Sequence, residues 1–294
     1  MKKVLIVLAI AAILALPGCN KNKKTVTIAT KPMTEQFILG EMLKALIEEN
    51  TDIKVGNKKG IGGGTANIHP ALIEGEIDMY PEYTGTAWNY VLKKTGIPDD
   101  ETLFTELTKE YKEKYNLEWV GMYGFNNTYG LVVHKDIAGR YGLESFSDLT
   151  PYSKDLTFGG EYDFFEREDG YDALCETYGY TFKKNVDLDI GLKYTAINNK
   201  QIDVMNIFTT DGQLSVADVK MLKDDKNFYQ TYYCGTIVRE DTLQKYPELR
   251  DVLMKMDNIL TETEMAALNH EVENNSRDES VVAKDFLRSK GLLK

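Results

Sequence analysis

Histidine, cysteine and proline are scarce in this chain of 294 residues, which holds 3 His, 3 Cys and 7 Pro. No two cysteines form a C-x-x-C pair, which argues against a zinc ribbon, and three cysteines are too few for a disulfide scaffold. His69, His134 and His270 have no second histidine or cysteine three or four residues away, and neither H-E-x-x-H nor G-x-S-x-G occurs. The glycines at 60–64 lack the Lys-Ser/Thr of a phosphate loop and predict a turn. The sequence therefore predicts no metal, no cofactor and no catalytic residue, and thus no enzyme.

Positive charge is also in the minority, with 35 Lys and Arg against 46 Asp and Glu and a net charge of −11. A nucleic-acid partner needs a basic face, so this balance argues against one. Tyrosine is abundant instead, with 18 Tyr against 11 Phe and 2 Trp. Its ring is apolar and its tip is polar, which suits either a wet binding surface or a scatter of half-buried rings.

The first residues have the features of a secretory signal. Lys2 and Lys3 precede an apolar run at 4–16 that is short for a membrane span. The run ends in Leu-Pro-Gly-Cys at 16–19, which resembles a bacterial lipobox. We therefore expect a signal peptide at 1–18, a lipid on Cys19 and a polar tether at 19–24. The protein would then lie outside the cytoplasm, anchored to the cell membrane by this lipid. The alternative is an ordinary cleaved signal followed by a chance cysteine.

The rest of the chain alternates between strand and helix periodicities. An apolar stripe at 35–49 predicts an amphipathic helix, and a long helical tail is expected at 247–292. The alternation predicts an α/β fold with mostly parallel sheets. Because no linker separates two halves, we expect one discontinuous lobe, 25–124 plus 231–294, with a second lobe at 125–230 inserted into it.

Three loops of this α/β pattern are expected to face a ligand. They lie at 30–36, 81–86 and 208–212, where strands run into the following elements. In open α/β sheets, ligands bind beyond the carboxyl ends of strands. The sequence leaves open whether Cys175 and Cys234 form a disulfide.

Four segments resemble the substrate-binding proteins of osmoprotectant ABC transporters, the glycine betaine, choline and carnitine group. They are TKPMTEQ at 30–36, GEIDMYPEYTGT at 75–86, GFNNTY at 124–129 and TTDG at 209–212. The resemblance implies a two-lobed fold like that of type II periplasmic binding proteins, with two crossing strands. It also implies that the lobes capture a small quaternary-ammonium ligand and deliver it to an ABC permease in the membrane.

A quaternary ammonium explains why such a site needs aromatic residues. It has no N–H to donate, and ring faces offer it both negative potential and apolar contact. By similarity to the family, the aromatic box here involves Tyr83, Tyr129, Phe208 and either Tyr232 or Tyr233. Phe208 stands where the family has tyrosine, so it keeps the ring and loses the hydroxyl.

A betaine also carries a carboxylate, and the positions that match the family's carboxylate contacts are Lys31, Thr86 and Arg167. Arginine offers a planar fork, lysine a point charge and threonine a neutral donor. The alternatives are an exposed loop lysine and an arginine paired with its acidic neighbours at 166–169. Asn127 is expected to contribute a backbone carbonyl to the methyl groups.

The leading hypothesis is thus a receptor for glycine betaine or a related betaine such as carnitine. Lys31 and Arg167, if both unpaired, would repel choline and favour a ligand with a carboxylate. The alternatives are a choline-preferring receptor of the same family, an extracytoplasmic enzyme acting on a choline-like compound, and a purely structural surface lipoprotein.

Overall fold

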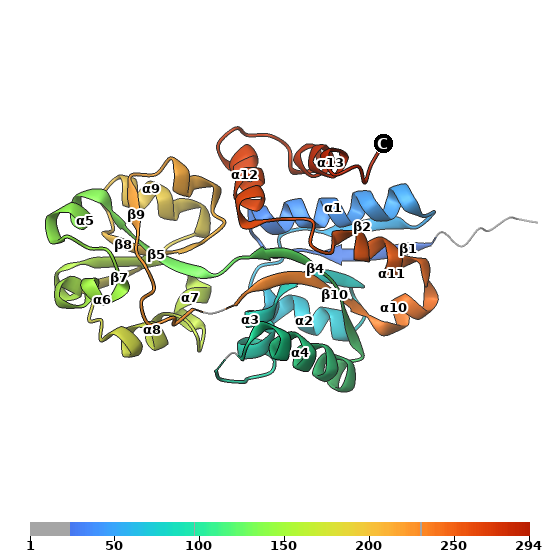
Figure 1. Cartoon of the computed structure of the whole chain (residues 1–294), viewed down its shortest axis with the longest axis horizontal. Coiled ribbons are helices and arrows are strands. Elements are labelled where there is room, and N and C mark those ends of the chain that lie inside the picture. Colours follow the sequence, from blue (N-terminus) through green and yellow to red (C-terminus); the bar gives the residue numbers. More distant parts are fainter. Residues whose placement is uncertain (1–23, 97, 230) are drawn as a thin grey trace, which may run out of the picture.

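The computed structural model describes residues 24–96, 98–229 and 231–294. They form two α/β lobes side by side, joined by strands that run between them (Figure 1). Lobe I contains both the beginning and the end of the described chain, and lobe II contains its middle. The predicted signal peptide and the predicted lipidation site Cys19 lie outside the described residues.

Lobe I is built on a sheet of five strands. They are β1 (Thr25–Ala29), β2 (Lys54–Lys58), β3 (Met79–Tyr83), β4 (Leu117–Asn126) and β10 (Tyr233–Arg239). Their order is β2-β1-β3-β10-β4, with β1 parallel to β2 and β3, and β10 antiparallel to β3 and β4. The sheet therefore combines strands from both ends of the described chain.

Helices cover both faces of this sheet. On one face lie α1 (Thr34–Asn50), α11 (Glu248–Leu253), α12 (Glu262–Glu273) and α13 (Glu279–Ser289). On the other lie α2 (Thr65–Ile73), α4 (Asp100–Tyr115) and the short α3 (Thr84–Thr86), which runs into a π-helical turn at Ala87–Val91; α10 (Glu240–Lys245) follows β10. The predicted helix at 35–49 is confirmed as α1, because Ile38, Met42 and Leu46 form an apolar stripe buried against the sheet.

Lobe II repeats the architecture on a smaller scale. Its strands are β5 (Tyr129–His134), β6 (Thr157–Gly160), β7 (Lys184–Asp187), β8 (Val204–Phe208) and β9 (Val219–Met221), in the order β7-β6-β8-β5-β9. Its helices are α5 (Lys135–Tyr141), α6 (Phe146–Leu149), α7 (Tyr162–Glu166), α8 (Tyr171–Tyr178) and α9 (Lys193–Asn198). The two sheets support the predicted division at 124 and 231, which stays a prediction.

The lobes are joined at two crossings that are hydrogen-bonded to each other. The backbone N–H of Asn127, between β4 and β5, donates to the carbonyl of Tyr232 (3.1 Å). The N–H of Tyr232, on the returning crossing, donates to Asn126 Oδ1 (2.8 Å). A third contact lies near α12, where Asn269 Nδ2 donates to the carbonyl of Thr210 in lobe II (2.8 Å). Contacts of α12 with lobe II therefore add to those between the two crossings.

The structure corrects two expectations and answers one open question. The sheets are mixed rather than mostly parallel, because the crossing strands β5 and β10 pair antiparallel with their neighbours. The helical tail is divided into α11, α12 and α13, and Asn258 and Ser276 take left-handed conformations between them (φ 51° and 54°). Cys175 and Cys234 are both free thiols, so no disulfide joins them.

Candidate functional site

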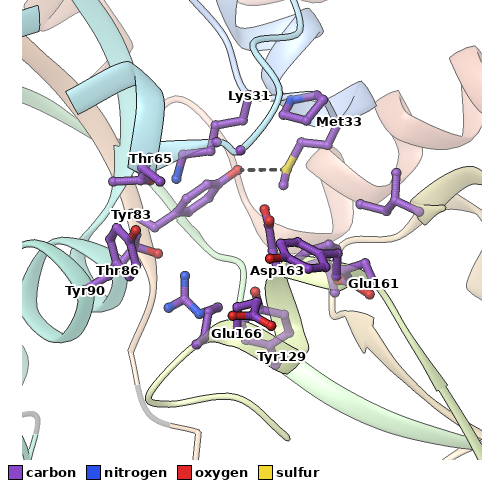
Figure 2. A pocket seen from close by; sticks show the side chains of 18 of the residues that line it. Lys31, Met33, Thr65, Tyr83, Thr86, Tyr90, Tyr129, Glu161, Asp163 and Glu166 are labelled. Atoms are coloured by element: carbon purple, nitrogen blue, oxygen red, sulfur yellow. Dashed lines mark hydrogen bonds between the residues drawn. The ribbon is translucent and has the colours of Figure 1, made fainter. Parts of the chain in front are cut away.

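A cavity of about 640 Å³ lies between the lobes, and we call it the aromatic cavity. Lobe I lines it with the segment after β1, the turn before α2 and the end of β3, and lobe II with α7 and the ends of β7 and β8. Figure 2 shows Lys31, Thr65 and Tyr83 on one side of the space and Tyr129 and Glu166 on the other. The three predicted ligand-facing loops thus all contribute to this cavity.

Four of the five predicted rings line the aromatic cavity: Tyr83, Tyr129, Phe208 and Tyr232. The ring centroid of Tyr129 lies 5.0 Å from that of Phe208 and 6.2 Å from that of Tyr232, the latter nearly perpendicular at 83°. Tyr129 and Phe208 face each other because β5 and β8 pair at these two residues. Rings from both lobes therefore meet around one space.

Tyr233 lies elsewhere. It lines a separate cavity with Thr84, Asp100 and Phe104. Tyr232 precedes β10 and Tyr233 is its first residue, and successive side chains of an extended chain point to opposite sides. Of the two alternatives, the structure thus brings Tyr232 and not Tyr233 to the cavity.

Gly85 makes room for the ring of Tyr232. A Cβ atom at this position would lie 2.6 Å from the Tyr232 ring, so the ring would have to move to admit any other residue. The glycine of the Tyr-Thr-Gly-Thr segment therefore lets the ring pack directly on α3. The Tyr232 hydroxyl then donates to Asp169 Oδ2 (2.5 Å), which ties this ring to lobe II.

Lys31 lines the cavity but is not an exposed loop lysine. It is 6% exposed, and its ammonium forms an ion pair with the completely buried carboxylate of Glu82. Glu82 also accepts hydrogen bonds from the Thr65 hydroxyl and the Tyr83 N–H (both 2.7 Å). The Lys31 ammonium lies 4.8 Å from the Tyr83 ring centroid, a cation–π contact within the protein itself.

Arg167 is likewise paired. Its Nε and Nη2 donate to the two oxygens of Asp169 (2.7 and 2.6 Å), and its Cζ lies 5.7 Å from the centroid of Tyr129. Burial alone raises the pKa of the Asp169 carboxyl, but Arg167 and the Tyr232 hydroxyl lower it below its ordinary value. The expectation of two unpaired cations in the cleft is therefore wrong: Lys31 and Arg167 each face a buried or nearly buried carboxylate.

Acidic side chains form the rest of the charged lining. They are Glu161, Asp163, Glu166, Asp187 and Asp189, all from lobe II or its loops. Glu161 is neutralised by Lys193, whose Nζ lies 2.9 Å from its Oε2. With Lys31 and Arg167 already paired, the remaining carboxylates give the cavity a negative potential, which attracts a cation.

Thr86 and Asn127 complete the predicted set, and both are buried in the lining. The amide nitrogen of Asn127 donates to Glu35 Oε1 (2.8 Å), while its Oδ1 is buried without a partner. The side chain of Asn127, not only the predicted backbone carbonyl, therefore presents an acceptor. No group of His, Cys, Asp and Glu within the described ranges is placed to hold a metal ion.

The comparisons with known proteins agree with this geometry. Residues 24–289 match the family described as the substrate binding domain of ABC-type glycine betaine transport systems. The chain belongs to this family.

Among its relatives, the ergothioneine transport permease/ergothioneine binding protein EgtU of Helicobacter pylori is 43% identical over 98% of this chain. The chain spans about half of that protein, 52% of its length. The carnitine transport binding protein OpuCC of Listeria monocytogenes is 35% identical, and the match covers 93% of this chain and 90% of OpuCC.

A solved structure described as a glycine betaine/carnitine/choline ABC transporter is 33% identical, has a TM-score of 0.75 and covers 92% of this chain and 100% of that one. The predicted fold, two-lobed and of the type II binding-protein class, is thereby confirmed. The predicted role is also confirmed: the chain is the substrate-binding component of an ABC importer and acts outside the cytoplasm. No helix in the described part of the chain is long and apolar enough to cross a membrane.

Several residues that line the aromatic cavity were not predicted from the sequence. Tyr90 follows α3, Tyr162 begins α7, and Met33 lies 3.8 Å from the Tyr83 hydroxyl, the contact drawn in Figure 2. The acids Asp163 and Glu166 belong to a charged run that looks like a solvated helix face. Only the position of α7 at the mouth of the cavity reveals them, and no local signal in the sequence does.

Proposed function

We propose that the aromatic cavity holds the trimethylammonium head of a betaine, which the protein passes to a permease in the cell membrane. The observation that carries this proposal is the meeting of Tyr83, Tyr129, Phe208 and Tyr232 at one acid-lined cavity between the lobes. Each ring face that a cation contacts contributes about 0.5–2 kcal/mol, depending on how completely water is removed. A trimethylammonium group has no N–H donor and so gains no affinity from conventional hydrogen bonds. Contacts with several ring faces supply that affinity instead.

The carboxylate of a betaine is proposed to join the ion pair of Arg167. A guanidinium has five N–H donors, and two of those of Arg167 are directed at Asp169. The others serve the ligand carboxylate, with the hydroxyl of Thr86 as a neutral donor on the opposite wall. Because Asp169 already offsets the charge of Arg167, the site repels the cation of choline less strongly than two unpaired cations would.

The proposed ligand is a betaine larger than glycine betaine. The cavity of about 640 Å³ lies within the usual range for pockets that enclose drug-sized molecules, and it is much larger than glycine betaine, a zwitterion of five carbon atoms. Relatives of this chain are named for glycine betaine, carnitine and ergothioneine. We propose that the preferred ligand is ergothioneine, the trimethylammonium betaine of an imidazole amino acid. Carnitine and glycine betaine are the next candidates.

A choline-preferring receptor is the second candidate, and the acidic lining of lobe II favours it. Both candidates imply binding without catalysis, in keeping with relatives that are transport binding proteins. We also propose that the lipobox-like segment ending at Cys19 attaches the protein to the cell membrane.

Isothermal titration of purified protein with ergothioneine, carnitine, glycine betaine and choline tests the proposal. At least one carboxylated betaine is expected to bind more tightly than choline. Tighter binding of choline than of all three betaines would favour the second candidate, and binding of none of the four would overturn the proposal.

A further inference from the structure

A second cavity of about 180 Å³ adjoins the aromatic cavity. The two share Pro32, Met33, Asn127, Ile190 and Phe208 in their linings. The second cavity continues between the start of α1, the loop after β8 and the end of α12, where it is lined by Glu35, Asp211, Asn269 and Glu273. A ligand in the aromatic cavity therefore has a neighbouring space into which it can extend.

Two residues that line this second cavity each carry a buried amide oxygen without a hydrogen-bond partner: Asn127 Oδ1 and Asn269 Oδ1. Asn127 is 5% exposed and Asn269 is 2% exposed. Their orientation is fixed, because the amide nitrogen of Asn127 donates to Glu35 and that of Asn269 to the carbonyl of Thr210 (both 2.8 Å). A buried acceptor without a partner costs about 1–3 kcal/mol, and a donor on a ligand relieves this cost.

Three carboxylates also line this cavity, and two of them already accept hydrogen bonds from the protein. Glu35 accepts from the hydroxyls of Tyr83 and Thr210 (both 2.5 Å) and from the amide of Asn127. Asp211 accepts from the Tyr194 hydroxyl (2.9 Å). Glu273, which is partly exposed to the cavity, has a pKa raised to about 7 by burial and by the neighbouring charge of Asp211.

The one lysine of this lining is already engaged. Lys193 Nζ donates to the carbonyl of Asn206 and pairs with Glu161, both at 2.9 Å. The described walls therefore present mainly acceptors, which suit a ligand group that carries N–H or O–H donors and do not suit an anion.

We infer that the second cavity is a tail subsite, which receives the N–H-bearing end of a betaine whose trimethylammonium head occupies the aromatic cavity. The inference rests on the proposed function and narrows it to betaines with a donor-bearing side chain, such as an imidazole ring. Glycine betaine has the same trimethylammonium carboxylate head and no such tail, so it leaves this cavity to water.

The test compares ergothioneine with glycine betaine by isothermal titration into the wild type, Glu273→Gln and Glu271→Gln. Glu273→Gln is isosteric and removes the charged acceptor from the tail subsite. Glu271 lies on the same helix, pairs with Arg277 outside both cavities and is the matched control. Glu273→Gln is expected to weaken ergothioneine at least fivefold and to change glycine betaine less than twofold, while Glu271→Gln changes neither.

Each other outcome counts against one of the two statements. If ergothioneine binds Glu273→Gln as it binds the wild type, or binds the wild type no more tightly than glycine betaine does, the tail subsite is wrong. In that case the proposed function still stands if the wild type binds glycine betaine and Tyr129→Ala lowers the affinity for it. If neither ligand binds the wild type, the proposed function fails and the tail subsite fails with it. If ergothioneine alone binds the wild type, the tail subsite is wrong unless Glu273→Gln weakens it at least fivefold while Glu271→Gln leaves it unchanged.

Discussion

The two lobes contribute walls of different character to the aromatic cavity. The lobe I wall is a closed polar network, in which the buried side chains of Lys31, Glu82 and Thr65 satisfy one another. The lobe II wall carries Tyr129, the acids of α7 and a ring, Tyr162, that is 61% exposed. Lobe I is therefore preorganised, whereas lobe II presents groups whose surroundings change when a ligand or the other lobe covers them.

The two ion pairs show the same difference. The side chains of Lys31 and Glu82 are 8% and 0% exposed, while those of Arg167 and Asp169 are 12% and 17% exposed. Removing one partner of a buried pair leaves an uncompensated charge and destabilises the fold. We therefore expect changes at Lys31 to act mainly on stability, and changes at Arg167 to act mainly on ligand choice.

The largest expected effect is that of Arg167→Ala on betaine binding. Truncating one partner of a desolvated charge pair typically costs about 2–5 kcal/mol, so glycine betaine affinity should fall at least about thirtyfold. Choline should bind as before or more tightly, because Asp169 would then offer its cation an uncompensated carboxylate. Titration of both ligands into the variant measures the two changes.

Arg250→Ala is the control for this change, since Arg250 pairs with Glu118 on the surface of lobe I. Its affinities should match those of the wild type. Equal losses of betaine and choline in Arg167→Ala would mean that the residue supports the structure of the cleft and does not select its ligand.

The next largest effect is expected at Tyr129, whose ring contacts Phe208 and Tyr232. Tyr129→Ala removes one ring face from the cation and should weaken betaine binding about tenfold, since 1.4 kcal/mol is a factor of ten. Tyr129→Phe keeps the face and should cost less. Tyr233→Ala, which changes a ring outside the cavity, should cost nothing. Equal losses in the Ala and Phe variants of Tyr129 would assign the effect to the hydroxyl.

These contrasts also mark how much the sequence could predict. Tyr83, Asn127 and Tyr129 lie in local sequence motifs. These motifs were enough to predict that the three residues line the cavity. Lys31 and Arg167 lie there as well. Of the five predicted rings, only that of Tyr233 does not line the cavity. Side chains alternate between the two faces of a strand, and the sequence did not show at which residue β10 begins.

The partners of the predicted residues were beyond the reach of the sequence. Glu82 follows Lys31 by 51 positions, and only the parallel pairing of β1 with β3 brings the two charges together. The tail subsite combines the start of α1, the loop after β8 and the end of α12, which lie far apart in the chain. No spacing rule connects such residues, since tertiary packing alone decides that they meet.

A third prediction concerns stability in the tail subsite, where Glu273 is faced by Glu35 from α1, by Asp211, and by Lys193 and Tyr194 from α9. Its pKa rises from an ordinary 4.5 to about 7 because of burial and then Asp211. Between these values the unfolded chain has lost a proton that the folded chain keeps, so the free energy of unfolding falls as the pH rises from 4.5 to 7. Above that range this contribution is constant.

Glutamine has no ionisable proton, so Glu273→Gln removes this fall in the free energy of unfolding between pH 4.5 and 7. The melting temperature of the variant should equal that of the wild type near pH 4.5 and exceed it by about 2–4 °C at pH 8. Glu271→Gln should show no such gain, since Arg277 lowers the pKa of Glu271 and the ionised form is the favoured one. Melting curves that differ equally at both pH values would contradict the assignment to ionisation.

The smallest effect is expected at Tyr162, the exposed ring of the lobe II wall. It begins α7 at the mouth of the aromatic cavity, and a ligand that bridges both lobes favours a closed arrangement in which this ring is covered. Solution scattering should therefore give a smaller radius of gyration at saturating ligand. Because a rim contact contributes little compared with a fully desolvated one, Tyr162→Ala should weaken binding only about two- to threefold and leave the compaction intact. A scattering profile that ligand does not change, in a protein shown to bind it, would mean that the two walls are already in place before the ligand arrives.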